Sequence, residues 1–256
     1  MTFDFWETLF MDTPELDRRR DELRCQGLKE NLAKLGVNVS TEDLAEGFRE
    51  STTWLVNIWK KGEQVSTLEQ IRYIVNHATK NQLALPAESE FLGNLEESYW
   101  SPSLTAPATL NTDAPEVLRR LHDRRLKIGL ICNTGRGPGR ALRELMRREG
   151  VLGYFDATIF SDEVGYGKPD KRIFLAAAEK LRLKPNDILH VGDNIENDVR
   201  GAQSSGMKTL LFDYEVPSCF REQASLLSLT RDSDSSSEIK PDGRIKSLSE
   251  VLKFIR

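Results

Sequence analysis

The chain has 256 residues, 39% of them hydrophobic and 30% charged, which suits a soluble protein of one large or two modest domains. A net charge of −4 disfavours a nucleic-acid partner, and no apolar run reaches the roughly 20 residues of a membrane span. Three widely spaced cysteines and the lack of a signal-like N-terminus lead us to expect a reducing, cytoplasmic location.

The first half of the chain, after about ten residues, has helical periodicity. Ser66 and Glu69 form a capping box ahead of one apolar run, and Pro14 and Gly36 bracket another. The Pro-rich stretch 101–115 is predicted to be a linker. Four helices are expected, at about residues 14–35, 41–61, 67–75 and 87–100, the second of them with a break.

From about Ala114 the pattern changes, and short apolar runs alternate with amphipathic segments. Such alternation predicts βαβ units, hence a parallel sheet with helices on both faces and an α/β, Rossmann-like fold. Ligand sites in such sheets lie beyond the carboxyl ends of the strands. Strands are expected within residues 126–133, 155–160, 187–193 and 208–213, with a last short strand and helix near 245–255.

Polar residues gather at or just after these expected strand ends. A carboxylate in such a place can attack phosphorus or carbon and form a covalent ester. An anionic substrate then needs charge compensation, which Mg²⁺ with hard oxygen ligands or a lysine can supply. The candidates lie in four stretches, "FDFWETL" with Asp4, "LICNTG" with Cys132, Asn133 and Thr134, "GYGKPDKRIF" with Lys168, and "VGDNIENDV" with Asp193 and Asp198.

In this order the four stretches resemble the four motifs of the haloacid dehalogenase-like (HAD) hydrolase superfamily. The resemblance implies a Rossmann-like core made of residues 1–11 and 112–256. It also implies that residues 12–111, inserted between the first and second motifs, form a small all-helical cap domain that selects the substrate.

The resemblance assigns roles residue by residue. Asp4 is the expected nucleophile, and Lys168 balances the charge of the nucleophile and the transferred group. Mg²⁺ would be held by Asp4, the backbone carbonyl of Trp6 and Asp193, with Asp198 binding through water or pairing with the lysine. Asn133 and Thr134 would bind the phosphoryl group, helped by backbone N–H groups ahead of the next helix. Cys132 replaces the usual serine or threonine, and its thiol is a weak donor.

Trp6 is the main departure from the family pattern. Family phosphatases carry a second aspartate there as the general acid, and an indole cannot replace it, which costs roughly 10²- to 10⁴-fold in rate. The dehalogenase branch has an aromatic residue at this position, but it lacks the acid that Asp193 supplies here. One hypothesis is that Glu7 or a residue of the cap replaces the missing acid.

We therefore predict a Mg²⁺-dependent hydrolase acting through an aspartyl intermediate, a phosphatase of a small phosphorylated metabolite. Without an acid at Trp6, good leaving groups such as aryl or acyl phosphates are favoured. The alternatives are a 2-haloacid dehalogenase-type hydrolase and a non-catalytic binding protein. We expect a monomer or homodimer. Four further side chains are predicted to be structural: Thr8 bonding its loop backbone, His190 packed and hydrogen-bonded in a strand, and the pair Trp54 and Trp59 in the core or surface of the cap.

Overall fold

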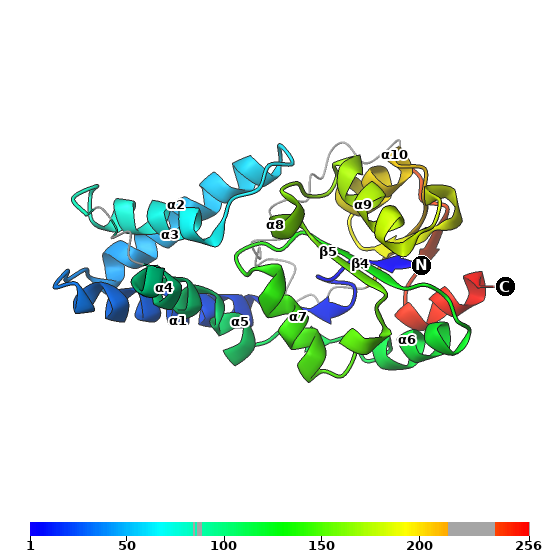
Figure 1. Ribbon diagram of the computed structural model, residues 1–256, viewed down its shortest axis with the longest axis horizontal. Helices are drawn as coiled ribbons and strands as arrows, with labels where there is room; N and C mark the ends of the chain where they lie inside the picture. The colour runs from blue at the N-terminus through cyan, green and yellow to red at the C-terminus, as the bar shows by residue number, and fades with distance from the viewer. Residues whose placement is uncertain (84, 86–88, 215–238, 256) are drawn as a thin grey trace.

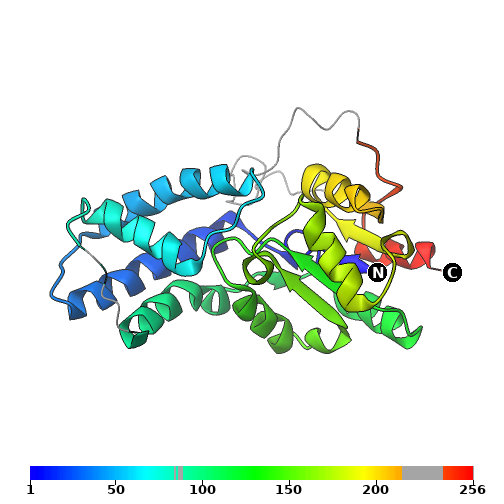
Figure 2. The ribbon, with the colours of Figure 1, turned by 45° about the horizontal axis from the view of Figure 1, so that its top comes forward.

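The computed structural model describes residues 1–83, 85, 89–214 and 239–255. It has two parts, which Figures 1 and 2 show side by side. One part is a group of long helices from the first half of the chain. The other is a twisted sheet with helices on both faces, and it contains the N-terminal strand together with the second half of the chain.

The sheet has six parallel strands in the order β5-β4-β1-β6-β7-β8. The central strand β1 is only Thr2–Phe3, yet it pairs with β4 on one side and with β6 on the other. The other strands are β4 (Gly129–Cys132), β5 (Ala157–Phe160), β6 (Leu189–Gly192), β7 (Lys208–Phe212) and β8 (Gly243–Ile245). The expected strands are all present, and the α/β fold class is confirmed.

The two faces of the sheet are covered by different helices, and β4 shows why. Leu130 and Cys132 belong to one apolar cluster and Ile131 to another, because successive strand residues point to opposite faces. Helices α6 (Ala114–Asp123), α7 (Gly139–Arg148) and the 3₁₀ segment Leu248–Phe254 cover the first face. Helices α9 (Lys171–Leu181) and α10 (Gly201–Ser204) cover the second.

The helices of the first half pack around an apolar cluster of their own. They are α1 (Pro14–Lys34), α2 (Thr41–Trp59), α3 (Thr67–Ala78) and α4 (Ser89–Trp100), and together we call them the helical insert. Side-chain caps begin the first three, and the Ser66–Glu69 capping box is present at α3. Helix α2 is continuous, without the expected break.

Residues 101–115 are more structured than the predicted linker. They hold a short helix, α5 (Pro102–Thr105), and the strand β3 (Thr109–Leu110), which pairs with β2 (Phe10–Met11) in a small antiparallel ribbon. Sequence reasoning missed this ribbon because its strands are two residues long and lie about a hundred residues apart. The ribbon pairs the segment that leads from the sheet into the helical insert with the segment that leads back to the sheet. No helix among the described residues is long and apolar enough to cross a membrane.

Candidate active site

Three charged side chains meet at the carboxyl ends of β1 and β6. Lys168 Nζ lies 2.6 Å from Asp4 Oδ1 and 2.7 Å from Asp198 Oδ1, and all three residues are buried. Asp4 directly follows β1, and Asp198 lies in a π-helix, Ile195–Arg200, after β6. Segments far apart in the sequence thus place a lysine between two carboxylates.

These charges set each other's protonation. Burial alone would lower the pKa of Lys168, but the nearby charges of Asp198 and Asp4 raise it well above its ordinary value. Burial alone would raise the pKa of Asp198, but the charge of Lys168 and a hydrogen bond from His190 hold it well below its usual range. Lys168 is therefore a fixed cation and Asp198 a fixed anion at neutral pH.

Asp193 completes a group of three carboxylates. One oxygen each of Asp4, Asp193 and Asp198 lies within 4.8 Å of the others, a spacing at which one cation can contact several of them. Burial and the charges of Asp198 and Asp193 raise the pKa of Asp4 well above its ordinary value, against the opposing charge of Lys168. A divalent cation would relieve this repulsion, so the donor set fits Mg²⁺.

Asp198 fits the role of lysine partner better than that of direct ligand. Its Oδ1 lies 2.7 Å from Lys168 Nζ and 3.1 Å from His190 Nε2, and its Oδ2 accepts the Asn194 N–H at 3.0 Å. A Cβ built on Gly192 would lie 2.2 Å from Asp198 Cγ, so only glycine lets this carboxylate cross the end of β6. His190, predicted to be a packed, hydrogen-bonded residue, has Asp198 as its partner and so belongs to the site's hydrogen-bond network.

Asn133 and Thr134 have different surroundings. Asn133 lines the cavity into which these acids face. Its side-chain amide accepts a hydrogen bond from the Lys168 N–H at 2.7 Å and donates one to the Lys168 carbonyl at 2.9 Å, and so holds the Lys168 backbone. Thr134 does not line that cavity, and its N–H donates to Ser161 Oγ at 3.0 Å. The N–H expected to bind phosphate is therefore already used, which leaves the backbone at Gly135 facing the cavity.

Two further features of this loop limit the donors that it can offer to a phosphoryl group. The N-terminus of α7 is occupied, because the Gly139 N–H donates to the carboxylate of Asp162 at 3.1 and 3.2 Å. Cys132 is fully buried, and its thiol donates to the Asn133 carbonyl at 3.4 Å. Burial raises the pKa of Cys132 well above its ordinary value, and the charge of Asp4 adds to this, so the thiol stays protonated.

The active-site cavity, of about 110 Å³, lies between the sheet and the helical insert. The sheet side supplies the acids, Lys168 and Trp6, and the end of α2 and the loop between α2 and α3 supply Trp59, Lys60 and Gln64. Sequence reasoning missed these three residues and assigned Trp59 to the core or surface of the cap. The available signal was their place in or just beyond the last turn of an amphipathic helix, where large side chains have no neighbouring turn to cover them.

Glu7 and Thr8, which follow Trp6, behave differently from each other. Glu7 lines the cavity with a φ of 55°, a left-handed conformation that favours glycine. Its carboxylate accepts hydrogen bonds from the Asp12 N–H, at 3.3 Å, and from the Tyr214 hydroxyl, and both stabilise the ionised form. Thr8 Oγ1 is buried and has no hydrogen-bond partner among the described residues, so the expected bond to its loop is absent.

Comparisons with known proteins agree with this architecture. The sequence model of the haloacid dehalogenase-like hydrolase family matches residues 1–206, and a second, HAD-hydrolase-like model matches residues 165–250. The chain is 33% identical over 100 residues to glyceraldehyde 3-phosphate phosphatase of Methanopyrus kandleri, covering 38% of this chain and 41% of the relative. It is 31% identical over 142 residues to ribulose-1,5-bisphosphate 5-phosphatase of Halopiger xanaduensis, covering 56% of this chain and 58% of the relative.

Solved structures match nearly the whole length. A 2-haloacid dehalogenase from Pseudomonas syringae has a TM-score of 0.65 at 23% identity, over 98% of this chain and 95% of that one. A HAD phosphatase from Thermococcus onnurineus has a TM-score of 0.60 at 22% identity, over 99% and 95%. At such identities the likeness shows the fold alone, but the sequence match to the family model covers most of the chain. The motifs, the fold and the family match agree: the chain belongs to the haloacid dehalogenase-like hydrolases.

Proposed function

We propose that this hydrolase is a phosphatase of a small phosphorylated metabolite, with Asp4 as its nucleophile. The observation that carries the proposal is the group of Asp4, Asp193 and Asp198 in one small cavity, with the buried Lys168 paired to Asp4 and Asp198. Lys168, together with a divalent cation held by these acids, would balance the negative charge of a bound phosphoryl group. Both relatives described above are named as phosphatases, which supports this reaction class.

The residues divide the work as follows. An oxygen of Asp4 attacks phosphorus, the bond from phosphorus to the leaving oxygen breaks, and the leaving group departs with the electron pair. Lys168, held by Asp198 and by Asn133, keeps a positive charge beside the attacking carboxylate. Water then attacks the phosphorus of the aspartyl phosphate and regenerates Asp4. Mg²⁺, when bound by Asp4, Asp193 and the Trp6 carbonyl, would supply charge neutralisation of the phosphoryl oxygens.

Trp6 affects the departure of the leaving group, because it provides no proton for the leaving oxygen. Trp6 lines the cavity in the place of the usual acid, and Glu7 beside it is held as a carboxylate by two donors. The contacts of Glu7 therefore disfavour the hypothesis that it donates the missing proton. Substrates whose leaving group departs without a proton, such as aryl or acyl phosphates, suit this site better than alkyl monoesters.

We propose further that residues 12–111 act as a cap over the site. Trp59, Lys60 and Gln64 form the wall of the cavity opposite Asp4, so they would contact the part of a substrate that differs between metabolites. Closure of such a wall excludes water from the phosphoryl group.

The test is phosphate release from p-nitrophenyl phosphate with and without Mg²⁺, run beside halide release from 2-chloropropionate. The proposal expects phosphate release that requires both the metal and Asp4, and no halide release. Halide release that survives EDTA would instead assign a haloacid dehalogenase. Absence of both activities over a panel of aryl, acyl and alkyl phosphates would assign a non-catalytic binding protein.

A further inference from the structure

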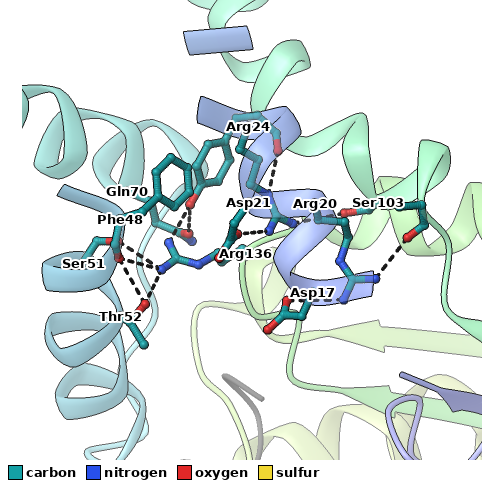
Figure 3. Close-up of polar contacts among 12 residues, drawn as sticks. Asp17, Arg20, Asp21, Arg24, Phe48, Ser51, Thr52, Gln70, Ser103 and Arg136 are labelled. Atoms are coloured by element: carbon teal, nitrogen blue, oxygen red, sulfur yellow. Dashed lines mark hydrogen bonds and ion pairs between the residues drawn. The ribbon is translucent and has the colours of Figure 1, made fainter. Parts of the chain in front are cut away.

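Arg136 lies at the boundary between the sheet and the helical insert. It belongs to the loop that follows β4, three residues after Asn133, and only 5% of its surface is exposed. Its guanidinium donates hydrogen bonds away from its own domain core, into the insert (Figure 3). The acceptors are Thr52 Oγ1 at 2.8 Å, Ser51 Oγ at 3.0 Å and the Phe48 carbonyl at 3.3 Å on α2, and Tyr99 Oη at 3.0 Å on α4.

All of these acceptors are uncharged. Two neighbouring arginines of α1, Arg20 and Arg24, form ion pairs with aspartates, whereas Arg136 forms none within the part of the chain that the structure describes. It also stacks on the ring of Phe48, with 5.2 Å from Cζ to the ring centre. A buried charge that pairs directly with no carboxylate among the described residues depends on its hydrogen bonds, so Arg136 holds this geometry only when α2 and α4 are in place.

A second contact joins the same loop to the insert. Gln70 of α3 donates to the Gly135 carbonyl at 3.4 Å and accepts from the Tyr99 hydroxyl at 2.9 Å. Gly135 lines the active-site cavity. Consecutive residues of the loop, Gly135 and Arg136, are thus bound to three different helices of the insert.

The loop leads directly to the reactive group. Asn133 binds the backbone of Lys168 on both its N–H and its carbonyl, and Lys168 Nζ contacts Asp4. A shift of Arg136 that moved this loop would therefore change the position of Asn133 and, through it, of Lys168. Misplacement of about 1 Å in such a site can cost roughly 10²-fold in rate.

We propose that Arg136 is a positioning residue, through which the placement of the helical insert sets the geometry of the active-site loop 133–136. The proposal rests on the proposed function for its effect on catalysis, but its structural part can be measured without any turnover. It predicts that Ser51 and Thr52 of α2 affect catalysis, although neither residue lines the active-site cavity.

The experiment removes the two hydroxyl acceptors on α2 and leaves Arg136 itself, the Phe48 carbonyl and Tyr99 in place. The double variant S51A/T52V keeps the size of both side chains nearly unchanged, and T53V, at an exposed position of the same helix, is the matched control. Hydrogen–deuterium exchange of residues 133–136 and the kinetics of p-nitrophenyl phosphate hydrolysis are measured on all three proteins. R136K, which keeps the charge but not the planar fork, is a second test of the same contacts.

We expect S51A/T52V and R136K to raise the exchange rate of loop 133–136 several-fold and to lower kcat about tenfold or more, with KM changed less. T53V should leave both unchanged. Unchanged exchange in loop 133–136 in S51A/T52V would overturn the proposal, as would faster exchange spread evenly over the whole chain. If no variant, including the native chain, hydrolyses any phosphate, the proposed function fails while the exchange result still decides the coupling.

Discussion

The sheet edge and the boundary between the sheet and the helical insert both bury charge, but they do so in opposite ways. At the sheet edge, Lys168 lies between two carboxylates, and each charge fixes the protonation of the others. At the boundary with the insert, Arg136 is held by hydroxyl and carbonyl oxygens that carry no charge. The first arrangement is suited to chemistry, because its charges act on a bound group. The second is suited to placement, because its hydrogen bonds have strict directions.

This difference predicts that substitutions at the sheet edge change the reaction itself. D4N should reduce phosphate release by roughly 10³-fold or more, because an amide oxygen is a poor nucleophile and no other carboxylate directly follows β1. Asp213 directly follows β7 on the same edge, with 58% of its side chain exposed, and D213N is the matched control. Equal activity of D4N and D213N in a steady-state assay would contradict the assignment of Asp4.

Lys168 should matter for stability as well as for activity. K168M leaves Asp4 and Asp198 buried without their shared cation, so we expect a loss of about 3–5 kcal/mol in the free energy of unfolding. K171M, at an exposed position near the start of α9, should change it by no more than about 0.5 kcal/mol. Urea denaturation measures both, and a similar small loss in the two variants would show that the buried cluster does not depend on Lys168.

A substitution at Trp6 should increase one activity, the hydrolysis of alkyl phosphates. W6D places a carboxyl group where the leaving oxygen needs a proton, so the ratio of alkyl to aryl phosphate hydrolysis should rise by up to about 10²-fold. W6L removes the indole without adding an acid and should leave the ratio unchanged. A rise of the ratio in W6L equal to that in W6D would mean that the bulk of the indole, and not the missing proton, limits alkyl substrates.

The smallest expected effect lies in the helical insert, at the cap of α3. S66A should lower the free energy of unfolding by about 1 kcal/mol, and S66T should retain most of it. The hydrogen bonds from Ser66 lower the pKa of Glu69 in the folded chain. Their contribution to the free energy of unfolding is therefore present at pH values above the ordinary carboxyl pKa, and it decreases as the pH falls from there through the lowered pKa. Thermal unfolding at pH 7 and pH 4 should show a smaller gap between S66A and the native chain at pH 4. A gap that is unchanged or larger at pH 4 would exclude this coupling.

The sequence predicted the sheet half of the molecule better than its boundary with the insert. The strands and the convergence of Asp4, Lys168, Asp193 and Asp198 followed from motifs in which a few adjacent residues determine the local backbone. Trp59 and Arg136 could not be predicted in this way, because their positions depend on how two separately packed parts of the chain meet. The hydrogen-bond partners of Thr134 and Cys132 were also beyond sequence reasoning, although the weak donor at Cys132 was expected. Their donors are used by Ser161 and by the Asn133 carbonyl, and such contacts appear only once the loop has folded.

The central claim is that Asp4 forms a covalent bond to the transferred phosphoryl group. It is tested most directly by quenching the enzyme during turnover of p-nitrophenyl phosphate in Mg²⁺, reducing it with borohydride and mapping the peptides by mass spectrometry. An aspartyl phosphate is reduced to homoserine, so we predict homoserine at position 4 in the native chain quenched during turnover, and none in the native chain quenched without substrate. Phosphate release at full rate with Asp4 unmodified, or with homoserine at another aspartate, would contradict the account.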